Sequence, residues 1–400
     1  MTDRRRLVWS LIAVGVVVRV VLAFKTYGVP YDTDSFKAVR AALGDDPLNV
    51  YASVNGDLNR WPYPPGFFPF VSAAGGLADL TGLAFHGWVQ LPPILADAVI
   101  AWLVQDYLGR RGASDGVRIG ATALVALGPS FWIISGYHGQ IDSLAILPAV
   151  AALWLWERSP PGPRRALIAG ALIGTGAAIK FVPGLLIVAL LPSVRSRREA
   201  AALVVPAVAV PVIAFAPFVL ADGDAVLDTF RNHRFLPGFG GISLLVQPDL
   251  ASNWLQQGAH APTSATRFLL DHETPILAVL LAPFVALVLI RRLDATLAAA
   301  LLWAALVVVN PGLELHFVVW ALPFALMVGW LWQVAAVQAA LFVPAAVLFW
   351  HPFGHAPTAL YATIMIATWC AVAAAIVAAS VRLALSATYS PAASSAPRSR

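Results

Sequence analysis

The chain has 400 residues, of which 59% are hydrophobic and only 12% are charged, with a net charge of +5 and a mean hydropathy of +0.76. Soluble domains carry about 25% charged residues, so this composition excludes them and indicates a polytopic helical membrane protein. The single cysteine, Cys370, excludes an intramolecular disulfide and a thiolate metal cluster.

Ten apolar stretches approach the length of about 20 residues that spans a bilayer as a helix. They cover residues 7–24, 88–107, 119–135, 141–156, 200–220, 275–290, 295–309, 317–331, 334–349 and 360–381. Two interrupted stretches, 66–84 and 166–191, are expected either to re-enter the membrane or to span it imperfectly. We therefore predict an all-α bundle of about 10–12 transmembrane or partly inserted helices. It forms one domain over residues 1–385, with outer loops at 25–65 and 221–274, and residues 386–400 form a disordered cytoplasmic tail.

The basic residues predict the orientation, because cytoplasmic loops are enriched in Lys and Arg. Six clusters hold 17 of the 26 basic residues: Arg4, Arg5 and Arg6; Arg110, Arg111 and Arg118; Arg158, Arg164 and Arg165; Arg195, Arg197 and Arg198; Arg291 and Arg292; Arg382, Arg398 and Arg400. All of them fall on one side if the segment 66–84 only dips into the membrane. We predict a multi-pass plasma membrane protein whose active site faces outward. The net charge then reflects attraction to anionic lipid headgroups and gives no reason to invoke nucleic acid.

The first outer loop concentrates the polar residues. It carries five carboxylates, including Asp32 and Asp34, followed by Arg60 and the turn Tyr63-Pro64-Pro65. Two acids spaced Asp-x-Asp need a cationic or protic partner when they are removed from water. A pair of caps for the helix predicted at 35–43 is the alternative, and it accounts for only one of the two acids. The loop is therefore the first candidate for a catalytic site.

Two polar clusters interrupt the following spans. The segment 136–143 joins two apolar helices with His138, Gln140 and Asp142, whereas a simple hairpin needs fewer polar groups. Lys180 lies inside the interrupted stretch, close to Pro183. A lone lysine can extend to the membrane surface, but broken helices at membrane depth typically line a cavity.

Two further clusters fall on the same predicted outer side. Arg231, His233 and Arg234 in the 221–274 loop form either a solvated surface or an anion clamp, since guanidinium groups bind phosphate oxygens in pairs. Glu314 and His316 lie in the polar break 310–316. His316 is either a site residue or a histidine of the membrane interface.

These patterns resemble the GT-C superfamily of membrane glycosyltransferases that use polyprenyl-phosphate sugars. Asp32-Thr33-Asp34 with Tyr63-Pro64-Pro65 is similar to the first-loop motifs of the polyprenol-phosphate-mannose mannosyltransferases. His138-Gly139-Gln140 with Asp142, and Glu314-Leu315-His316, are similar to motifs of the dolichyl-phosphate-glucose-dependent glucosyltransferases. In those enzymes an asparagine stands where this chain has Asp142. The resemblance implies a polyprenyl-phosphate-sugar donor, an acceptor that is lipid-linked or a cell-envelope glycan, and a hexose, with mannose favoured and glucose next.

An inverting hexosyltransferase of this kind, of EC type 2.4.1, needs one base and several cations. Asp34 is our first choice for the base, because it precedes the predicted helix and aligns with the first-loop acid of the family. Asp32 is the close alternative. Arg231, Arg234, His316 and Lys180 are expected to hold the phosphate. His138, Gln140 and Asp142 are expected to orient the acceptor or the sugar hydroxyls, and Arg60, Tyr63, His233 and Glu314 complete the predicted substrate-binding residues.

The sequence requires no cofactor, although an Asp-x-Asp pair can also bind Mg²⁺ or Mn²⁺. A lipid-linked-sugar flippase or a secondary transporter is the alternative function. We would expect inverted repeats in such a protein, and the sequence shows none.

Overall fold

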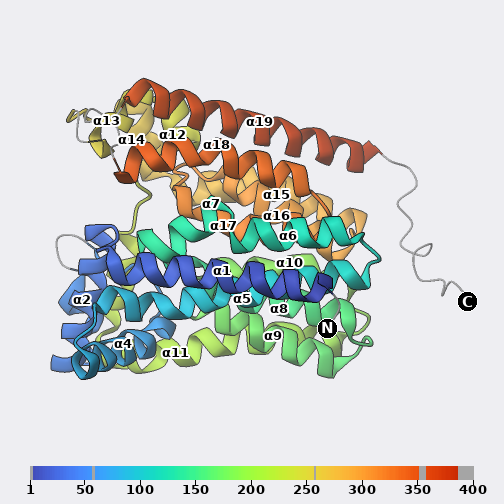
Figure 1. Ribbon diagram of the computed structural model, residues 1–400, viewed down its shortest axis with the longest axis horizontal. Helices are drawn as coiled ribbons and strands as arrows, with labels where there is room; N and C mark the ends of the chain where they lie inside the picture. The colour runs from blue at the N-terminus through green and yellow to red at the C-terminus, as the bar shows by residue number, and fades with distance from the viewer. Residues whose placement is uncertain (1–2, 56–58, 256–257, 351–356, 386–400) are drawn as a thin grey trace, which may run out of the picture.

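The computed structural model describes residues 3–55, 59–255, 258–350 and 357–385, which form helices and connecting turns with no strand among them. The predicted disordered tail, 386–400, lies outside these residues. Most of the long helices run side by side along the longest axis of the molecule (Figure 1). The prediction of an all-α membrane bundle is thus confirmed.

Among the described residues, seven helical segments are long and apolar enough to cross a membrane. They are α1 (Asp3–Lys25), α5 (Phe85–Arg110), the combination of α6 (Asp115–Ala126), α7 (Pro129–Trp132) and η2 (Ile133–His138), α11 (Arg197–Arg231), α15 (Glu273–Arg291), α18 (Leu331–Trp350) and α19 (Thr358–Leu385). Helix α11 changes direction at Asp222, whose backbone is not helical.

Shorter helices lie between and beside these segments. They are α8 (Asp142–Arg158), α9 (Pro163–Ala177), η3 (Val182–Leu185), α10 (Leu186–Leu190), η4 (Leu191–Ser193), α16 (Ala295–Val309), η6 (Leu315–Phe317) and α17 (Val318–Met327). Every residue of α17 is buried. The stretch 166–191 is interrupted as expected, because α9 ends at Ala177 and η3 begins at Val182, which leaves Lys180 in the break.

The two outer loops form short helices at one end of the bundle, which we call the loop end (Figure 1). The first loop folds into α2 (Pro30–Asp45) and α3 (Val50–Val54), and η1 (Pro65–Phe67) and α4 (Phe68–Thr81) follow directly after it. The second loop folds into α12 (Gly241–Val246), η5 (Pro248–Leu250), α13 (Ala251–Trp254) and α14 (Ser264–Asp271). With 14 residues, α4 is about 21 Å long, which is too short to cross a hydrocarbon core of about 30 Å.

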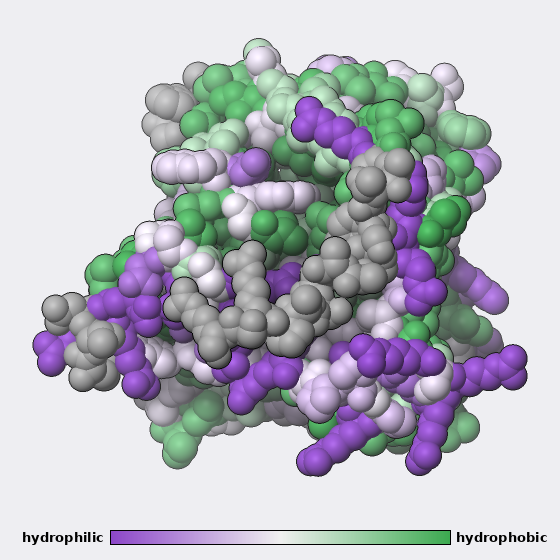
Figure 2. All heavy atoms as spheres, turned by 90° about the vertical axis from the view of Figure 1, so that its right-hand side faces the viewer, coloured by the Kyte–Doolittle hydropathy of each residue, from purple (hydrophilic) through white to green (hydrophobic). Residues whose placement is uncertain are grey.

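The opposite end of the molecule, which we call the basic end, gathers the arginine clusters of the described residues, whereas Arg398 and Arg400 lie outside those residues (Figure 1). Arg4 pairs with Asp115 at 2.6 Å and so joins the starts of α1 and α6. Arg165 pairs with Glu199 at 2.9 Å and joins α9 to α11. Hydrophilic side chains cover much of this end of the molecule (Figure 2). The structure therefore separates the basic clusters from the outer loops, as the predicted topology requires, while the membrane face of each end stays a prediction.

Candidate active site

A cavity of about 780 Å³ opens at the loop end. Its walls come from the start of α2, the segment 59–63, the hairpin 137–140, the segment 232–239, the loop 314–316 and the end of α18. Segments far apart in the sequence thus bring Asp32, Arg60, Tyr63, His138, Gln140, His233, Arg234, Glu314 and His316 to one space. A concave site with a few converging polar groups is typical of a ligand-binding pocket.

Asp32 lies in the first turn of α2 and points into this cavity. Gln140 Nε2 donates a hydrogen bond to Asp32 Oδ1 at 2.7 Å, and His138 Nε2 lies 3.0 Å from Asp32 Oδ2. The N-cap position of α2 is Val29, and no side chain caps the helix. The capping interpretation of the two acids therefore does not hold, and the partners of Asp32 are the protic groups of the hairpin.

Asp34 lies outside the cavity. The Tyr27 hydroxyl donates a hydrogen bond to its carboxylate, Lys37 Nζ lies 3.9 Å away, and about half of the Asp34 side chain is exposed. Helix α2 begins at Pro30, five residues before the predicted start at residue 35. Asp32 and Asp34 are two positions apart. On a helix with 3.6 residues per turn this spacing is more than half a turn, so the two carboxylates face different sides of α2. The choice of base is accordingly revised from Asp34 to Asp32.

Lys180 and Asp142 form a buried pair beneath the cavity. Lys180 Nζ lies 2.9 Å from Asp142 Oδ1 and donates to Gln140 Oε1 at 3.3 Å. The indole of Trp320 donates to the same Asp142 oxygen. The Gln140 amide is thus oriented from both sides, since its oxygen accepts from Lys180 and its nitrogen donates to Asp32. Lys180 and Asp142 do not line the cavity themselves, so the structure gives them a supporting position.

Glu314 and His316 form the opposite wall. His316 Nδ1 lies 3.5 Å from Glu314 Oε2, and the His316 ring stands edge to face against the His138 ring at 5.5 Å. Burial, reinforced by the negative charges of Asp32 and Asp142 and opposed by Lys180, raises the pKa of Glu314 to about 8. The Glu314 carboxyl is therefore protonated at neutral pH and can donate a hydrogen bond into the site.

Arg60 and Arg234 supply positive charge to the cavity wall. The Arg60 guanidinium lies 5.6 Å from the centre of the Tyr31 ring. Arg234 Nη1 donates to the backbone oxygens of Arg231 and His233, which folds its side chain back along the loop. Arg231 is exposed and lies outside the cavity. Of the predicted anion clamp, Arg234 and His233 therefore line the cavity and Arg231 does not, while Arg60, predicted as a substrate-binding residue, also lines it.

Two buried polar residues that the sequence analysis missed lie behind Asp32. His86 and Gln90 on α5 are both buried, and the Thr33 hydroxyl lies 3.4 Å from His86 Nδ1. Gly139 adopts a φ of 106° and packs against the His86 ring, a conformation that favours glycine. A His and a Gln four residues apart on an apolar helix lie on the same face of that helix. This spacing in the sequence could have identified His86 and Gln90 as candidate site residues.

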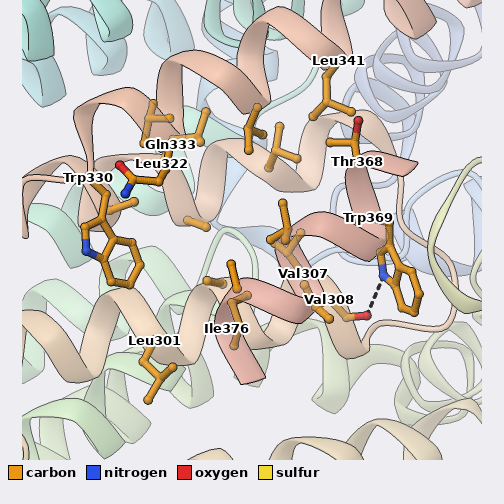
Figure 3. Close-up of a pocket in the computed structure, with 18 of the residues that line it drawn as sticks. Leu301, Val307, Val308, Leu322, Trp330, Gln333, Leu341, Thr368, Trp369 and Ile376 are labelled. Atoms are coloured by element: carbon orange, nitrogen blue, oxygen red, sulfur yellow. Dashed lines mark hydrogen bonds between the residues drawn. The ribbon is translucent and has the colours of Figure 1, made fainter. Parts of the chain in front are cut away.

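A second cavity, of about 380 Å³, lies between α16, α17, α18 and α19. Figure 3 shows its almost wholly apolar lining, with Val307, Leu322 and Ile376 among the labelled side chains. The Trp369 indole donates to the Val308 oxygen at 2.9 Å. Leu313 lines this apolar cavity, whereas its neighbour Glu314 lines the polar one. Consecutive residues of one loop thus line the two cavities.

The described residues contain no group of three or more His, Cys, Asp or Glu side chains that could hold a metal ion. Asp32 and Asp34 diverge, so they do not form the two-carboxylate cation site that their spacing suggested. Binding of Mg²⁺ or Mn²⁺ stays a prediction.

Comparisons with known proteins place this chain in a family. Residues 61–311 match the model of glycosyltransferase family 87. No curated protein matches the chain. Among solved structures, ArnT from Cupriavidus metallidurans, determined bound to undecaprenyl phosphate, has a similar fold, with a TM-score of 0.52 and 15% identity over 94% of this chain and 77% of that one. The chain therefore has the GT-C fold and belongs to glycosyltransferase family 87.

Proposed function

We propose that this glycosyltransferase moves a hexose, mannose in first place and glucose next, from a polyprenyl-phosphate carrier to a lipid-linked or cell-envelope glycan acceptor. The reaction takes place at the outer face of the plasma membrane. The observation that carries the proposal is the Asp32 carboxylate, held by His138 and Gln140 inside a cavity whose wall also presents arginines. Family 87 membership supports glycosyl transfer as the reaction.

Asp32 acts as the general base. Its carboxylate accepts the proton of the acceptor hydroxyl while the acceptor oxygen attacks the anomeric carbon, and the bond from that carbon to the phosphate oxygen breaks. The configuration inverts, and the polyprenyl phosphate leaves with the bonding electrons. Gln140 and His138 hold the carboxylate in place, because each of them contacts a different oxygen of Asp32. Lys180 supports this arrangement by fixing the Gln140 amide.

The leaving phosphate gains negative charge as the bond breaks. Arg60 and Arg234 line the cavity and supply the fixed positive charge that such a transition state needs. The isoprenoid chain takes the apolar cavity between α16 and α19, because its lining residue Leu313 directly precedes Glu314, which lines the polar cavity. The undecaprenyl phosphate bound in the structure of ArnT supports a donor of this chemical class.

A direct assay tests the proposal. Purified protein is incubated with radiolabelled polyprenyl-phosphate mannose or glucose and a membrane lipid extract, and new glycosidic bonds are detected by mass spectrometry. Free polyprenyl phosphate should compete with the donor, and nucleotide-linked sugars should not replace it. Passage of intact lipid-linked sugar across vesicles without a new glycosidic bond would favour the flippase instead.

A matched pair of arginine variants tests the phosphate contact in the same assay. Arg234→Ala should weaken binding of the donor and of free polyprenyl phosphate by about 10–100-fold, since a hydrogen bond to a charged group contributes about 1.5–3 kcal/mol. Arg231→Ala removes the same charge outside the cavity and should leave both affinities almost unchanged. Equal losses of affinity in the two variants would show that the arginines act only through the overall charge of the loop and that Arg234 does not contact the phosphate.

A further inference from the structure

An ion pair lies deep in the bundle, away from the cavity. Arg19 on α1 is buried, with Nε 3.1 Å from Asp97 Oδ2 on α5 and 3.2 Å from Ser135 Oγ in η2. The Ser135 hydroxyl also donates a hydrogen bond to Asp97 Oδ2, at 2.5 Å. Removing a charge pair from water is costly, and membrane spans rarely contain such a pair without a function. We call Arg19, Asp97 and Ser135 the brace.

The brace lies where a membrane helix stops and restarts. Helix α6 ends at Ala126, and α7 and η2 follow after a turn. The last carbonyl groups of a helix have no partner within that helix. Arg19 supplies hydrogen-bond donors to two of these carbonyl groups from outside the helix. Its Nη1 donates to the oxygen of Ala126, and its Nη2 donates to the oxygen of Val125 at 2.8 Å. The Arg19 guanidinium therefore binds the carbonyl groups at the end of α6 and also binds the Ser135 hydroxyl in the next segment.

The segment that the brace holds is the one that presents the site residues. Element η2 is a π-helix that runs from Ile133 to His138, and π-helical turns occur frequently at functional sites. A methyl group on Gly136 would come within 3.0 Å of Arg19 Cα, so the turn packs directly against the arginine. At its far end, His138 approaches Asp32, and its backbone oxygen accepts from Val29 at the start of α2.

We propose that the brace is a positioning group that fixes the π-helical turn, so that His138 and Gln140 meet the Asp32 carboxylate. Arg19, Asp97 and Ser135 do not line the cavity, and they act only through the turn that they hold. The effect on turnover rests on the proposed function of Asp32, whereas the effect on the turn itself does not.

A second buried ion pair provides a matched control. Arg165 and Glu199 are almost as buried as Arg19 and Asp97, and their atoms approach to 2.9 Å. This pair joins α9 to α11 at the basic end, whereas the hairpin 137–140 lines the cavity at the loop end. If buried pairs in this protein served stability alone, removing either one should have the same consequences.

The test replaces each pair by apolar residues, which leaves no uncompensated charge and is often tolerated. Arg19→Met with Asp97→Leu is compared with Arg165→Met with Glu199→Leu, both in lipid nanodiscs. The first readout is hydrogen exchange of the backbone amides of residues 133–140, which needs no substrate. The second is kcat and KM for sugar transfer, measured beside the midpoint of thermal unfolding.

We expect the brace variant to exchange these amides at least about 10-fold faster. Its kcat should fall by about 100-fold at a nearly unchanged KM, because misplacing a catalytic group by about 1 Å has that cost. The control variant should change neither quantity. Protected amides, or wild-type kcat, in a folded brace variant would overturn the proposal.

If the double variant does not fold, Ser135→Ala removes only the hydroxyl, and Ser135→Thr retains it. The alanine variant should lose kcat and the threonine variant should recover it. Equal kcat in the two would also overturn the proposal. If the wild-type protein transfers no hexose from any polyprenyl-phosphate donor, the proposed function fails, and the hydrogen-exchange comparison still decides whether the brace holds the turn.

Discussion

Asp32 and Asp34 have the same chemistry and nearly the same place in the sequence, and the helix separates their surroundings. The Asp32 carboxylate is mostly covered and contacts His138 and Gln140, whereas the Asp34 carboxylate is half exposed beside Tyr27 and Lys37. A general base must come within hydrogen-bonding distance of the proton that it removes. Only Asp32 meets this condition for a substrate in the cavity.

Asp32→Asn should therefore lower kcat by about two to four orders of magnitude, because the amide cannot accept the acceptor's proton. Donor binding should change little. Asp34→Asn, in the same helix, should stay within a few-fold of wild type. Steady-state kinetics of sugar transfer, with donor affinity measured separately, compares the two variants. A severe loss in Asp34→Asn beside normal turnover in Asp32→Asn would return the role of base to Asp34.

Glu314 makes the stability of the protein depend on pH. Its pKa rises from 4.5 in the unfolded chain to about 8 in the fold, chiefly through burial. The folded state thus retains a proton that the unfolded state releases. The stabilisation is complete below pH 4.5 and declines as the pH rises through about 8. Thermal unfolding in nanodiscs should show this decline in the wild type, and Glu314→Gln, a neutral isostere, should reduce it. An identical slope in both proteins would contradict the assignment.

At the scale of elements, two breaks in the helices bring the site together. The break after α9 places Lys180 against Asp142, and the turn between α6 and α8 carries His138 and Gln140. The first break is held from outside, since the backbone nitrogen of Gly66 in η1 donates to the oxygen of Ala178 at 2.8 Å. A methyl group on Gly66 would overlap that carbonyl group. The end of the first outer loop, where η1 begins, is therefore attached to the break by direct backbone contact.

Gly66→Ala should destabilise the protein by about 1–3 kcal/mol, the usual cost of overpacking, and should also slow turnover by displacing the break. Gly76→Ala on α4 is the control, because a methyl group at Gly76 meets nothing within 4 Å. Alanine in the middle of a helix should stabilise it by about 0.5–1 kcal/mol. Chemical unfolding of the two variants in detergent measures the difference. The prediction fails if Gly66→Ala is as stable as Gly76→Ala.

At the scale of the molecule, the chain separates its charges between two ends. The arginine clusters lie at the basic end, and the cavity lies at the loop end. Because cytoplasmic loops are enriched in Lys and Arg, we predict that the basic end faces the cytoplasm. A substrate carried by a lipid can then reach the cavity from the outer leaflet.

Labelling of single cysteines checks this orientation after Cys370, which is exposed, has been replaced by alanine. A cysteine at Asp45, exposed in the first outer loop, should react with a membrane-impermeant thiol reagent on intact cells. A cysteine at Ser196, exposed at the basic end, should react only after the cells are opened. The reverse pattern would place the cavity on the cytoplasmic side.

The sequence by itself determined the class of the protein, the position of its apolar helices and the charged and histidine residues that line its cavity. These properties depend on local composition, because a span must be apolar along its length, and polar groups are costly at membrane depth. The sequence could not choose between Asp32 and Asp34, since that choice depends on where α2 begins and which of its sides packs against the hairpin. It likewise could not exclude Arg231, pair Lys180 with Asp142, or join Arg19 to Asp97 and Ser135. Only the tertiary structure decided these, because each depends on contacts between helices distant in the chain.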